Sequence, residues 1–244
     1  MLQQYDICVL CPSDLDMSWF ENRFNIKPIY HRMNRIYFRS KESYSKLMER
    51  SSFYNDYKEW EYMLIVQPDV WMLRTSGKTI EDFMKYDEVY LGAPWSKQYA
   101  SNLGIDCELC GNGGFSLRKP KVLCNVLRNT QEQFRNSRLV SVEDQYISYI
   151  LHKKELDAPV STALRFAVDN EPKMWHQRLG TENLPLGVHM SKQEMREYWE
   201  PYIKKDIETT GETYHCQRII VSLTSFGERL KKDCGATIRK FLMT

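Results

Sequence analysis

The chain has 244 residues, of which 42% are hydrophobic and 27% are charged, with a formal net charge of +2. A balance this close to neutral excludes a broad electrostatic attraction to nucleic acid or to a membrane surface, and the hydrophobic content excludes general disorder. Apolar runs such as residues 63–66 are far shorter than the roughly 20 residues that span a bilayer, which excludes a transmembrane segment.

The first half of the chain predicts strands and helices in alternation. An apolar, β-branched strand covers residues 5–11, a short extended piece covers 35–39, and a helical period covers 40–57. The next strand, 61–69, is nearly continuously apolar, which is typical of a strand buried on both faces of a parallel sheet.

The alternation continues with short strands at 88–95 and 114–118. A helix begins at Pro120, and a second covers 141–152; their buried faces are predicted to be Val122, Leu123, Val126 and Leu127, and Ile147, Ile150 and Leu151. This order predicts an α/β domain with a mainly parallel sheet flanked by helices. In such sheets ligands bind at the carboxyl ends of the strands.

Composition changes near residue 205. We expect one domain over residues 1–205, a polar linker over 206–217, and the truncated start of a second domain over 218–244, which is too short to bury a core of its own. The apolar strand 218–223 is expected either to be poorly ordered or to pack against an unpaired strand edge near residues 5–10.

Two Cys-x-x-Cys pairs raise the alternative of a zinc-stapled binding module. Cys8 and Cys11 lie in a predicted strand, where residues three apart point to opposite faces, so they are poorly placed to chelate one ion. Cys107 and Cys110 therefore lack a second pair, and Gly-Asn-Gly-Gly after them predicts a tight turn that feeds a strand. With seven cysteines and no secretory segment, we expect reduced thiols and a cytoplasmic protein.

Five ordered motifs resemble a bacterial family assigned as glycosyltransferases, largely of unknown function, with a GT-A-like (Rossmann-type) fold. They are YMLIVQPDVW (62–71), YLGAPW (90–95), GNGGFSLR (111–118), VEDQY (142–146) and LPLGVHM (184–190). The resemblance covers roughly residues 5–200, and residues 218–229 more weakly resemble the opening of a second such domain. It implies transfer of a sugar from a nucleotide-diphosphate sugar to a hydroxyl of a cell-surface glycan precursor.

The resemblance assigns roles at the donor side of the site. GT-A enzymes commonly hold Mg²⁺ or Mn²⁺ with an Asp-x-Asp motif that neutralises the leaving diphosphate. Gln67-Pro68-Asp69 stands in that place, so Asp69 is the expected metal ligand and Gln67 a donor contact, with a plain turn after Pro68 as the alternative. His189 is the expected second metal ligand, although a lone His is more often structural.

The remaining assignments concern the sugar and the acceptor. The glycine-rich turn would let the backbone approach the sugar, and Trp95, like Trp71, would stack on sugar or base unless it is buried in the core; the turn consists of Gly111, Asn112, Gly113 and Gly114. Glu143 and Asp144 resemble an acidic pair that faces the acceptor, with Asp144 as the catalytic base. Alternatively, Asp144 completes a helix-capping box with Ser141.

The chain departs from the family at its start. Members usually begin with a strand and a helix ahead of the stretch that matches residues 5–10, so we expect the sheet to lack its first strand. The alternative to an active transferase is therefore an inactive or truncated relative that acts as a glycan-binding module.

Overall fold

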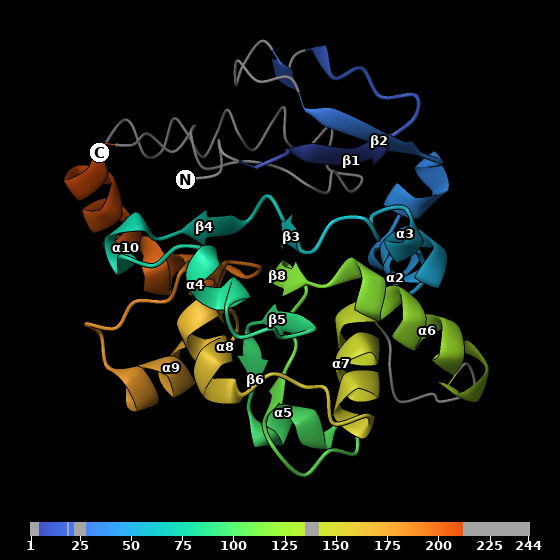
Figure 1. The fold of residues 1–244 in the computed structure, drawn as a ribbon. Coiled ribbons are helices and arrows are strands. Elements are labelled where there is room, and N and C mark those ends of the chain that lie inside the picture. Colours follow the sequence, from blue (N-terminus) through green and yellow to red (C-terminus); the bar gives the residue numbers. More distant parts are fainter. Residues whose placement is uncertain (1–4, 19, 22–27, 135–141, 212–244) are drawn as a thin grey trace.

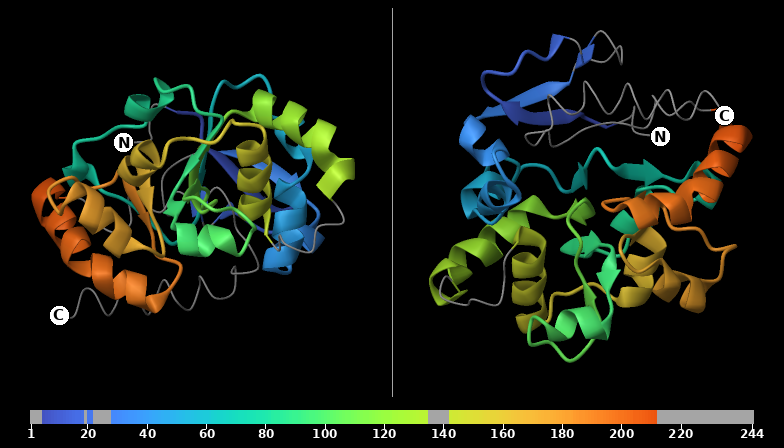
Figure 2. Two further views of the ribbon diagram at one scale, coloured as in Figure 1. Left: turned by 90° about the horizontal axis from the view of Figure 1, so that it is seen from below. Right: turned by 180° about the vertical axis from the view of Figure 1, so that it is seen from behind.

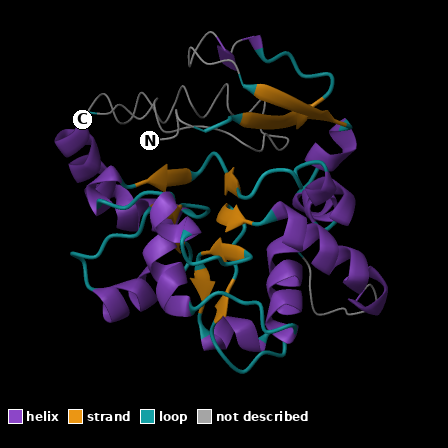
Figure 3. Ribbon diagram, in the orientation of Figure 1, coloured by secondary structure: helices purple, strands orange, loops and turns teal. Residues whose placement is uncertain are grey.

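The computed structural model describes residues 5–18, 20–21, 28–134 and 142–211 of the chain. A column of short strands occupies the centre, with helices on two sides, and a separate strand pair lies across one end (Figures 1 and 3). The architecture is mixed α/β. None of the helices in the described ranges is both long and apolar enough to cross a membrane.

The separate pair consists of β1 (Cys8–Pro12) and β2 (Ile29–Met33), which run parallel. The segment 35–39, predicted to be extended, is instead a 3-10 helix, η1 (Arg35–Phe38), because the Asn34 side chain accepts a hydrogen bond from Ile36 N and starts a turn. The prediction of an extended piece is therefore wrong at these residues.

The single helix expected over 40–57 is two helices. α2 (Lys41–Met48) starts at a capping box, in which Ser40 and Ser43 satisfy each other's backbone N–H groups. The chain becomes extended at Arg50, with ψ of 128°, before α3 (Ser51–Asn55). Apolar side chains of both helices still face one core, so the predicted helical period holds on both sides of the break.

The central strands form small sheets in which antiparallel pairs outnumber parallel ones. β8 (Phe115–Arg118) lies between β3 (Met63–Val66) and β5 (Tyr90–Gly92) and is antiparallel to both. The expected mainly parallel sheet is not confirmed. The reason lies in the turn before β8, where Gln67 N donates to Gly114 O at 2.9 Å and so directs β8 back along β3.

Two further small sheets complete the strand column. β10 (Gly187–His189) pairs antiparallel with β4 (Val70–Met72) and parallel with β9 (Ala167–Val168). β6 (Pro94–Trp95) pairs antiparallel with β7 (Leu109–Cys110). These pairings place the ends of β3, β7, β9 and β10 near one another, which matters for the site.

Helices cover the two sides of the strand column (Figure 2). One side carries α6 (Pro120–Phe134) and α7 (Glu143–Lys153), and the other α8 (Val160–Phe166), α9 (Pro172–Leu179) and α10 (Gln193–Thr210). Short helical pieces are η2 (Arg74–Ser76), α4 (Glu81–Met84) and α5 (Lys97–Ser101). The predicted buried faces of α6 and α7 are confirmed, since their apolar residues belong to the largest core cluster or pack against it.

The capping box predicted for Ser141 and Asp144 stays a prediction, because Ser141 lies outside the described residues. The residue before α7 is Val142, whose side chain makes no capping hydrogen bond. Asp144 accepts hydrogen bonds from Gly113 N and Gln145 N. Its carboxylate therefore contacts both the glycine turn and the first turn of its own helix.

The end of α10 passes beyond the predicted domain boundary. Residues 206–210, expected in the linker, are helical, and the fully buried Asp206 accepts hydrogen bonds from Trp71 Nε1 at 3.1 Å, Thr75 N at 2.7 Å and Thr75 Oγ1 at 2.8 Å. The linker end and the segment 218–244 lie outside the described residues, so the domain division stays a prediction.

This contact predicts a difference between two truncations. A chain ending at Lys205 loses Asp206 and leaves the buried Trp71 and Thr75 donors without their acceptor, whereas a chain ending at Gly211 keeps it. Hydrogen bonds to charged groups contribute about 1.5–3 kcal/mol each, so the loss of three leads us to expect that the shorter chain melts roughly 10 °C or more below the longer one. Equal melting temperatures in calorimetry would show that Asp206 does not tie α10 to the fold.

Candidate functional site

Four polar residues meet where strands end. Asp69 precedes β4, Asn112 follows β7, Asp169 follows β9, and His189 ends β10. The register of β10 against β4 pairs His189 with Val70, and Met190 N donates to Asp69 O at 2.8 Å, so the two ends are held together. Convergence therefore depends on an antiparallel pairing and not on the parallel sheet that was expected.

His189 is the centre of this group. Its Nε2 lies 3.1 Å from Asp69 Oδ1, and its Nδ1 lies 3.0 Å from Asn112 Oδ1 and 3.4 Å from Asp169 Oδ1. Asn112 Nδ2 donates to Asp169 Oδ2 at 2.8 Å, while its Oδ1 accepts from Gly114 N at 2.9 Å. Both ring nitrogens of His189 therefore face acceptors, which is satisfied when both carry protons.

The carboxylates around His189 also favour the ring with both nitrogens protonated. Burial lowers the pKa of His189, but the hydrogen bond and charge of Asp69, followed by the charges of Asp169 and Asp144, outweigh burial and raise the pKa above its ordinary value. Burial likewise opposes ionisation of Asp69, yet His189 holds the pKa of that carboxyl below the ordinary value. Both pKa shifts favour an imidazolium–carboxylate contact between the two side chains.

The raised pKa of His189 predicts a pH-dependent stability. A raised folded-state pKa means that the group stabilises the fold fully below its unfolded pKa of about 6.5, and that this stabilisation is lost as the pH rises through the folded pKa. The free energy of unfolding of wild type, minus that of His189→Gln, should therefore be larger at pH 6 than at pH 9, by about 1.4 kcal/mol for each unit of pKa difference. Urea titrations with a chelator present test this; a constant difference would contradict it.

The glycine turn fits tightly against this group. A Cβ on Gly114 would lie 2.3–2.6 Å from three atoms of the His189 ring, and a Cβ on Gly113 would lie 2.7 Å from Glu143 Oε1 and 3.0 Å from Arg118 Nη2. A Cβ on Gly111 would lie 2.5 Å from the ring of Trp95. These glycines are explained by close approach of side chains to the backbone, and not by positive φ.

Glu143 and Asp144 lie on the opposite side of the same turn. Asp144 Oδ2 accepts from Gly113 N at 3.3 Å, and burial raises the pKa of this partly exposed carboxyl although backbone hydrogen bonds lower it. Glu143 is only 4% exposed and accepts from Ser45 Oγ at 3.1 Å. Burial, and then the charge of Asp144, raise the pKa of Glu143.

A buried cation, Arg118, lies behind Glu143 and Asp144, and the sequence did not indicate it. Arg118 is fully buried and donates to Ser116 Oγ at 2.9 Å, to Tyr54 Oη at 2.6 Å and to Gly113 O at 3.4 Å. Its guanidinium also lies over the ring of Tyr90 at 4.8 Å. Arg118 therefore supports the turn from beneath, and its charge opposes the rise in the pKa of Glu143.

Asp169 was missed as well. Its carboxylate is 3% exposed and accepts hydrogen bonds from Asn112, Asn170 and Ser191. An Asp directly after an apolar strand was the available signal, but β9 has only two residues, too few for a sequence pattern to show.

The other predicted residues occupy different surroundings. Gln67 joins the site through its backbone, since Gln67 N donates to Gly114 O. Trp95 is 4% exposed and packs beneath Gly111, and Trp71 is buried with its Nε1 on Asp206, so the structure places both rings in the core. Both the oxygen and the nitrogen of the Asn112 side-chain amide form hydrogen bonds with protein groups, so Asn112 stabilises the turn.

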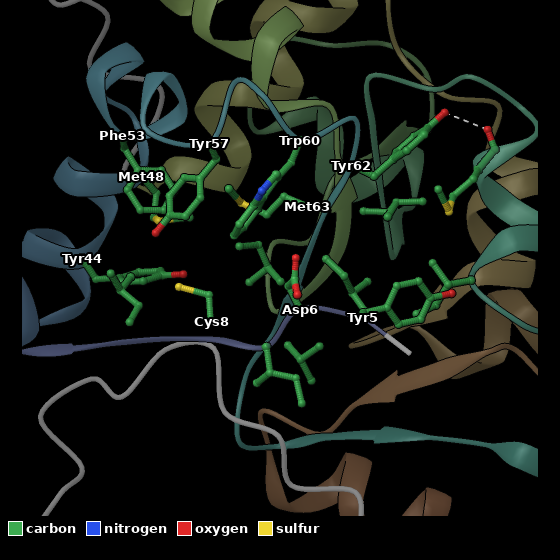
Figure 4. A pocket seen from close by; sticks show the side chains of 18 residues that line it. Tyr5, Asp6, Cys8, Tyr44, Met48, Phe53, Tyr57, Trp60, Tyr62 and Met63 are labelled. Atoms are coloured by element: carbon green, nitrogen blue, oxygen red, sulfur yellow. Dashed lines mark hydrogen bonds between the residues drawn. The ribbon is translucent and has the colours of Figure 1, made fainter. Parts of the chain in front are cut away.

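A cavity of about 260 Å³ lies elsewhere, between β1, the α2–α3 segment and β3 (Figure 4). Aromatic side chains line much of it, together with Asp6 and Cys8; they include Tyr5, Tyr44, Tyr57, Trp60 and Tyr62. The Tyr44 hydroxyl is buried and has no hydrogen-bond partner among the residues that the structure describes. None of the predicted site residues lines this cavity, so it is distinct from the cluster around His189.

The described residues offer a metal ion only small sets of ligands. Within the described ranges no group of three or more His, Cys, Asp or Glu side chains is arranged to hold a metal ion. Cys110 is buried, with Gly92 N donating to its sulfur at 3.3 Å, and Cys11 is buried in β1. Asp69 and His189 remain the pair expected to bind a cation.

Comparison with known proteins gives a family match and matches to solved structures. A family model described as "Protein of unknown function (DUF5672)" matches residues 29–189. No curated protein matches the chain. A solved structure titled "Crystal structure of a glycosyltransferase involved in the glycosylation of the major capsid of PBCV-1" has a TM-score of 0.44 and 14% identity, and the match covers 82% of this chain and 100% of that one. At this level of similarity the function has to be argued from the site.

Proposed function

This chain belongs to the family described as Protein of unknown function (DUF5672), and from its site we propose that it is a glycosyltransferase. It moves a sugar from a nucleotide-diphosphate sugar to a hydroxyl of a glycan precursor. The observation that carries the proposal is one glycine turn, 111–114, with the Asp69–His189 pair on one side and the Asp144 carboxylate on the other. A transfer reaction needs a charge-handling group at the leaving diphosphate and a base at the acceptor.

The Asp69–His189 pair suits the diphosphate side. Two ligands of one octahedral ion at about 2.1 Å lie about 3 Å apart, and Asp69 Oδ1 and His189 Nε2 are separated by 3.1 Å. The contact of His189 Nδ1 with Asn112 Oδ1 fixes the ring as a ligating His requires. The two residues therefore fit Mn²⁺ better than Mg²⁺, which prefers oxygen ligands; the ion would supply Lewis-acid stabilisation of the departing diphosphate. Without a cation, His189 as an imidazolium offers positive charge at the same place.

Asp144 suits the acceptor side. It is partly exposed, whereas Glu143 is buried behind the turn with Arg118 and Ser45. Asp144 is therefore the base that accepts the proton of the attacking hydroxyl. Glu143 is a positioning residue that holds the turn and the Arg118 guanidinium in place. A raised pKa makes Asp144 a stronger proton acceptor than an ordinary Asp.

The glycine turn 111–114 holds the Asp69–His189 pair and the Asp144 carboxylate in fixed positions on its two sides. Gly113 N donates to Asp144 and Gly114 N donates to Asn112, so neighbouring residues of one backbone segment position both halves. A sugar lying between His189 and Asp144 would have the diphosphate toward His189 and the acceptor hydroxyl toward Asp144. Stacking on Trp95 is not needed, since that ring supports the turn from within the core.

An assay of nucleotide-sugar turnover tests the proposal. Purified protein is incubated with Mn²⁺ and each of a panel of nucleotide-diphosphate sugars, and release of nucleoside diphosphate is measured with and without added glycan acceptors. We expect release with one class of donor, and loss of release in Asp69→Asn. No release from any donor, together with saturable binding of glycan to the wild type, would instead favour a glycan-binding module without activity.

A further inference from the structure

A second cluster of reactive side chains lies at the end of the molecule opposite the β1–β2 pair, where the loop after α5 meets the end of α7 (Figure 1). Cys107 Sγ lies 3.9 Å from His152 Nε2, and His152 Nδ1 lies 2.9 Å from Asp157 Oδ2. All three side chains are partly exposed. A thiol, an imidazole and a carboxylate in this order form the constellation of a nucleophile, its base and the group that orients the base.

The hydrogen bond to Asp157 defines which nitrogen of His152 can act as a base. A carboxylate oxygen only accepts, so Nδ1 carries the proton in this contact. The lone pair of the neutral ring is then on Nε2, the atom nearest the Cys107 sulfur. The hydrogen bond to Asp157 therefore favours the tautomer of His152 whose Nε2 can accept the thiol proton.

The turn after α7 brings Asp157 back to His152. Leu156 N donates to Leu151 O at 2.9 Å and Glu155 N donates to His152 O at 3.0 Å, the two bonds of a Schellman motif. Glu155, at the position that usually holds Gly, has φ of +57°, which costs about 1 kcal/mol or more for a residue with a side chain. The contacts around this turn hold the backbone in a conformation that places the carboxylate on the imidazole.

The other described thiols lack this arrangement. Burial raises the pKa of Cys110 to about 12, Cys11 and Cys124 are buried, and the half-buried Cys8, whose pKa burial also raises, has the Tyr57 hydroxyl and not an imidazole as its side-chain partner. Burial, followed by the charges of Asp157 and Asp106, also raises the pKa of the Cys107 thiol. Cys107 is therefore protonated at rest and needs a base at the moment of attack, as a serine nucleophile does.

We propose that Cys107, His152 and Asp157 form a covalent-modification site that reacts with a carbon electrophile bearing a leaving group. Sγ forms a bond to the electrophilic carbon, the bond from that carbon to the leaving group breaks with its electron pair, and the thiol proton moves to His152 Nε2. Asp157 stabilises the resulting imidazolium. This site is separate from the glycine turn and does not depend on the proposed transferase activity.

Iodoacetamide labelling of the folded full-length protein, followed by peptide mapping, tests the site. Cys107 should react faster than Cys8, Cys11, Cys110 and Cys124, and His152→Gln and Asp157→Ala should each slow labelling of Cys107 about 10-fold or more, because a positioned base contributes at least this much. His176→Gln, which changes a His on α9, is the matched control and should leave the rate unchanged.

The buried Cys110 serves as an internal reference for folding, since its labelling rises only if a variant opens. A Cys107 rate that is the same in wild type and in both variants, with Cys110 protected, would overturn the proposal, because exposure alone would then explain the reactivity. A rate that falls in both variants while Cys110 stays protected supports it.

Discussion

Gly114→Ala is expected to abolish ligand binding at the turn and to lower the melting temperature by several degrees. The added methyl would lie 2.3–2.6 Å from the His189 ring, which is held on both sides by Asp69 and Asn112 and cannot withdraw without breaking these contacts. Overpacking of this kind destabilises by about 1–3 kcal/mol, or roughly 2–10 °C for a chain of this size. Calorimetry and nucleotide binding measure the two effects.

Gly104→Ala provides the matched control for this substitution. Gly104 has φ of +71° and open space where a Cβ would lie, so alanine there is strained only by its backbone. It should lower stability by about 1 kcal/mol and leave binding intact. Normal binding by Gly114→Ala would show that the turn does not contact the ligand.

Asp144→Asn is expected to reduce kcat by about 100-fold to 10,000-fold while leaving donor affinity nearly unchanged, because general base catalysis contributes on this scale. The amide keeps the shape of the side chain and an acceptor for Gly113 N, but it cannot take a proton. Since burial raises the pKa of Asp144, the wild-type rate should fall on acidification at a pH above the ordinary Asp value of 3.8.

The control for this prediction is Asp87→Asn. Asp87 is an exposed carboxylate paired with Lys119, and its φ of +62° is one that Asn tolerates well. Its kcat should equal that of wild type. If Asp144→Asn loses donor affinity and keeps kcat, Asp144 binds the donor and another group is the base.

Part of the site could be predicted because polar residues that follow apolar strands stand out in a sequence. Asp69 and Asn112 are identifiable in this way, whereas His189 and Asp144 were expected from the family resemblance, and the structure brings all four together around one turn. The strand directions could not be predicted, because the sequence pattern of a buried strand is the same whether its neighbours are parallel or antiparallel.

Other features depended on local chemistry or on distant partners. The apolar residues of η1 suggested a strand, but the Asn34 cap decided for a 3-10 turn. Burial of Arg118 could not be expected, since Arg is seldom buried without partners and its partners, Tyr54 and Glu143, come from distant parts of the chain. The sequence did not indicate how far α10 extends, because its last turn is polar. The contacts of Asp206 with Trp71 and Thr75 hold this turn against the fold, and they join residues that are far apart in the sequence.

The central claim is that Asp69 and His189 form the binding site for a diphosphate with its cation, and thermal unfolding with ligand tests it most directly. A ligand at 100 times its Kd stabilises the folded chain by about 2.7 kcal/mol, which corresponds to a rise of roughly 5–10 °C. With Mn²⁺ and a nucleoside diphosphate together, wild type and the surface control Asp82→Asn should show this rise, and Asp69→Asn should not. The same rise in Asp69→Asn, or no rise in wild type with any nucleoside diphosphate, would contradict the account.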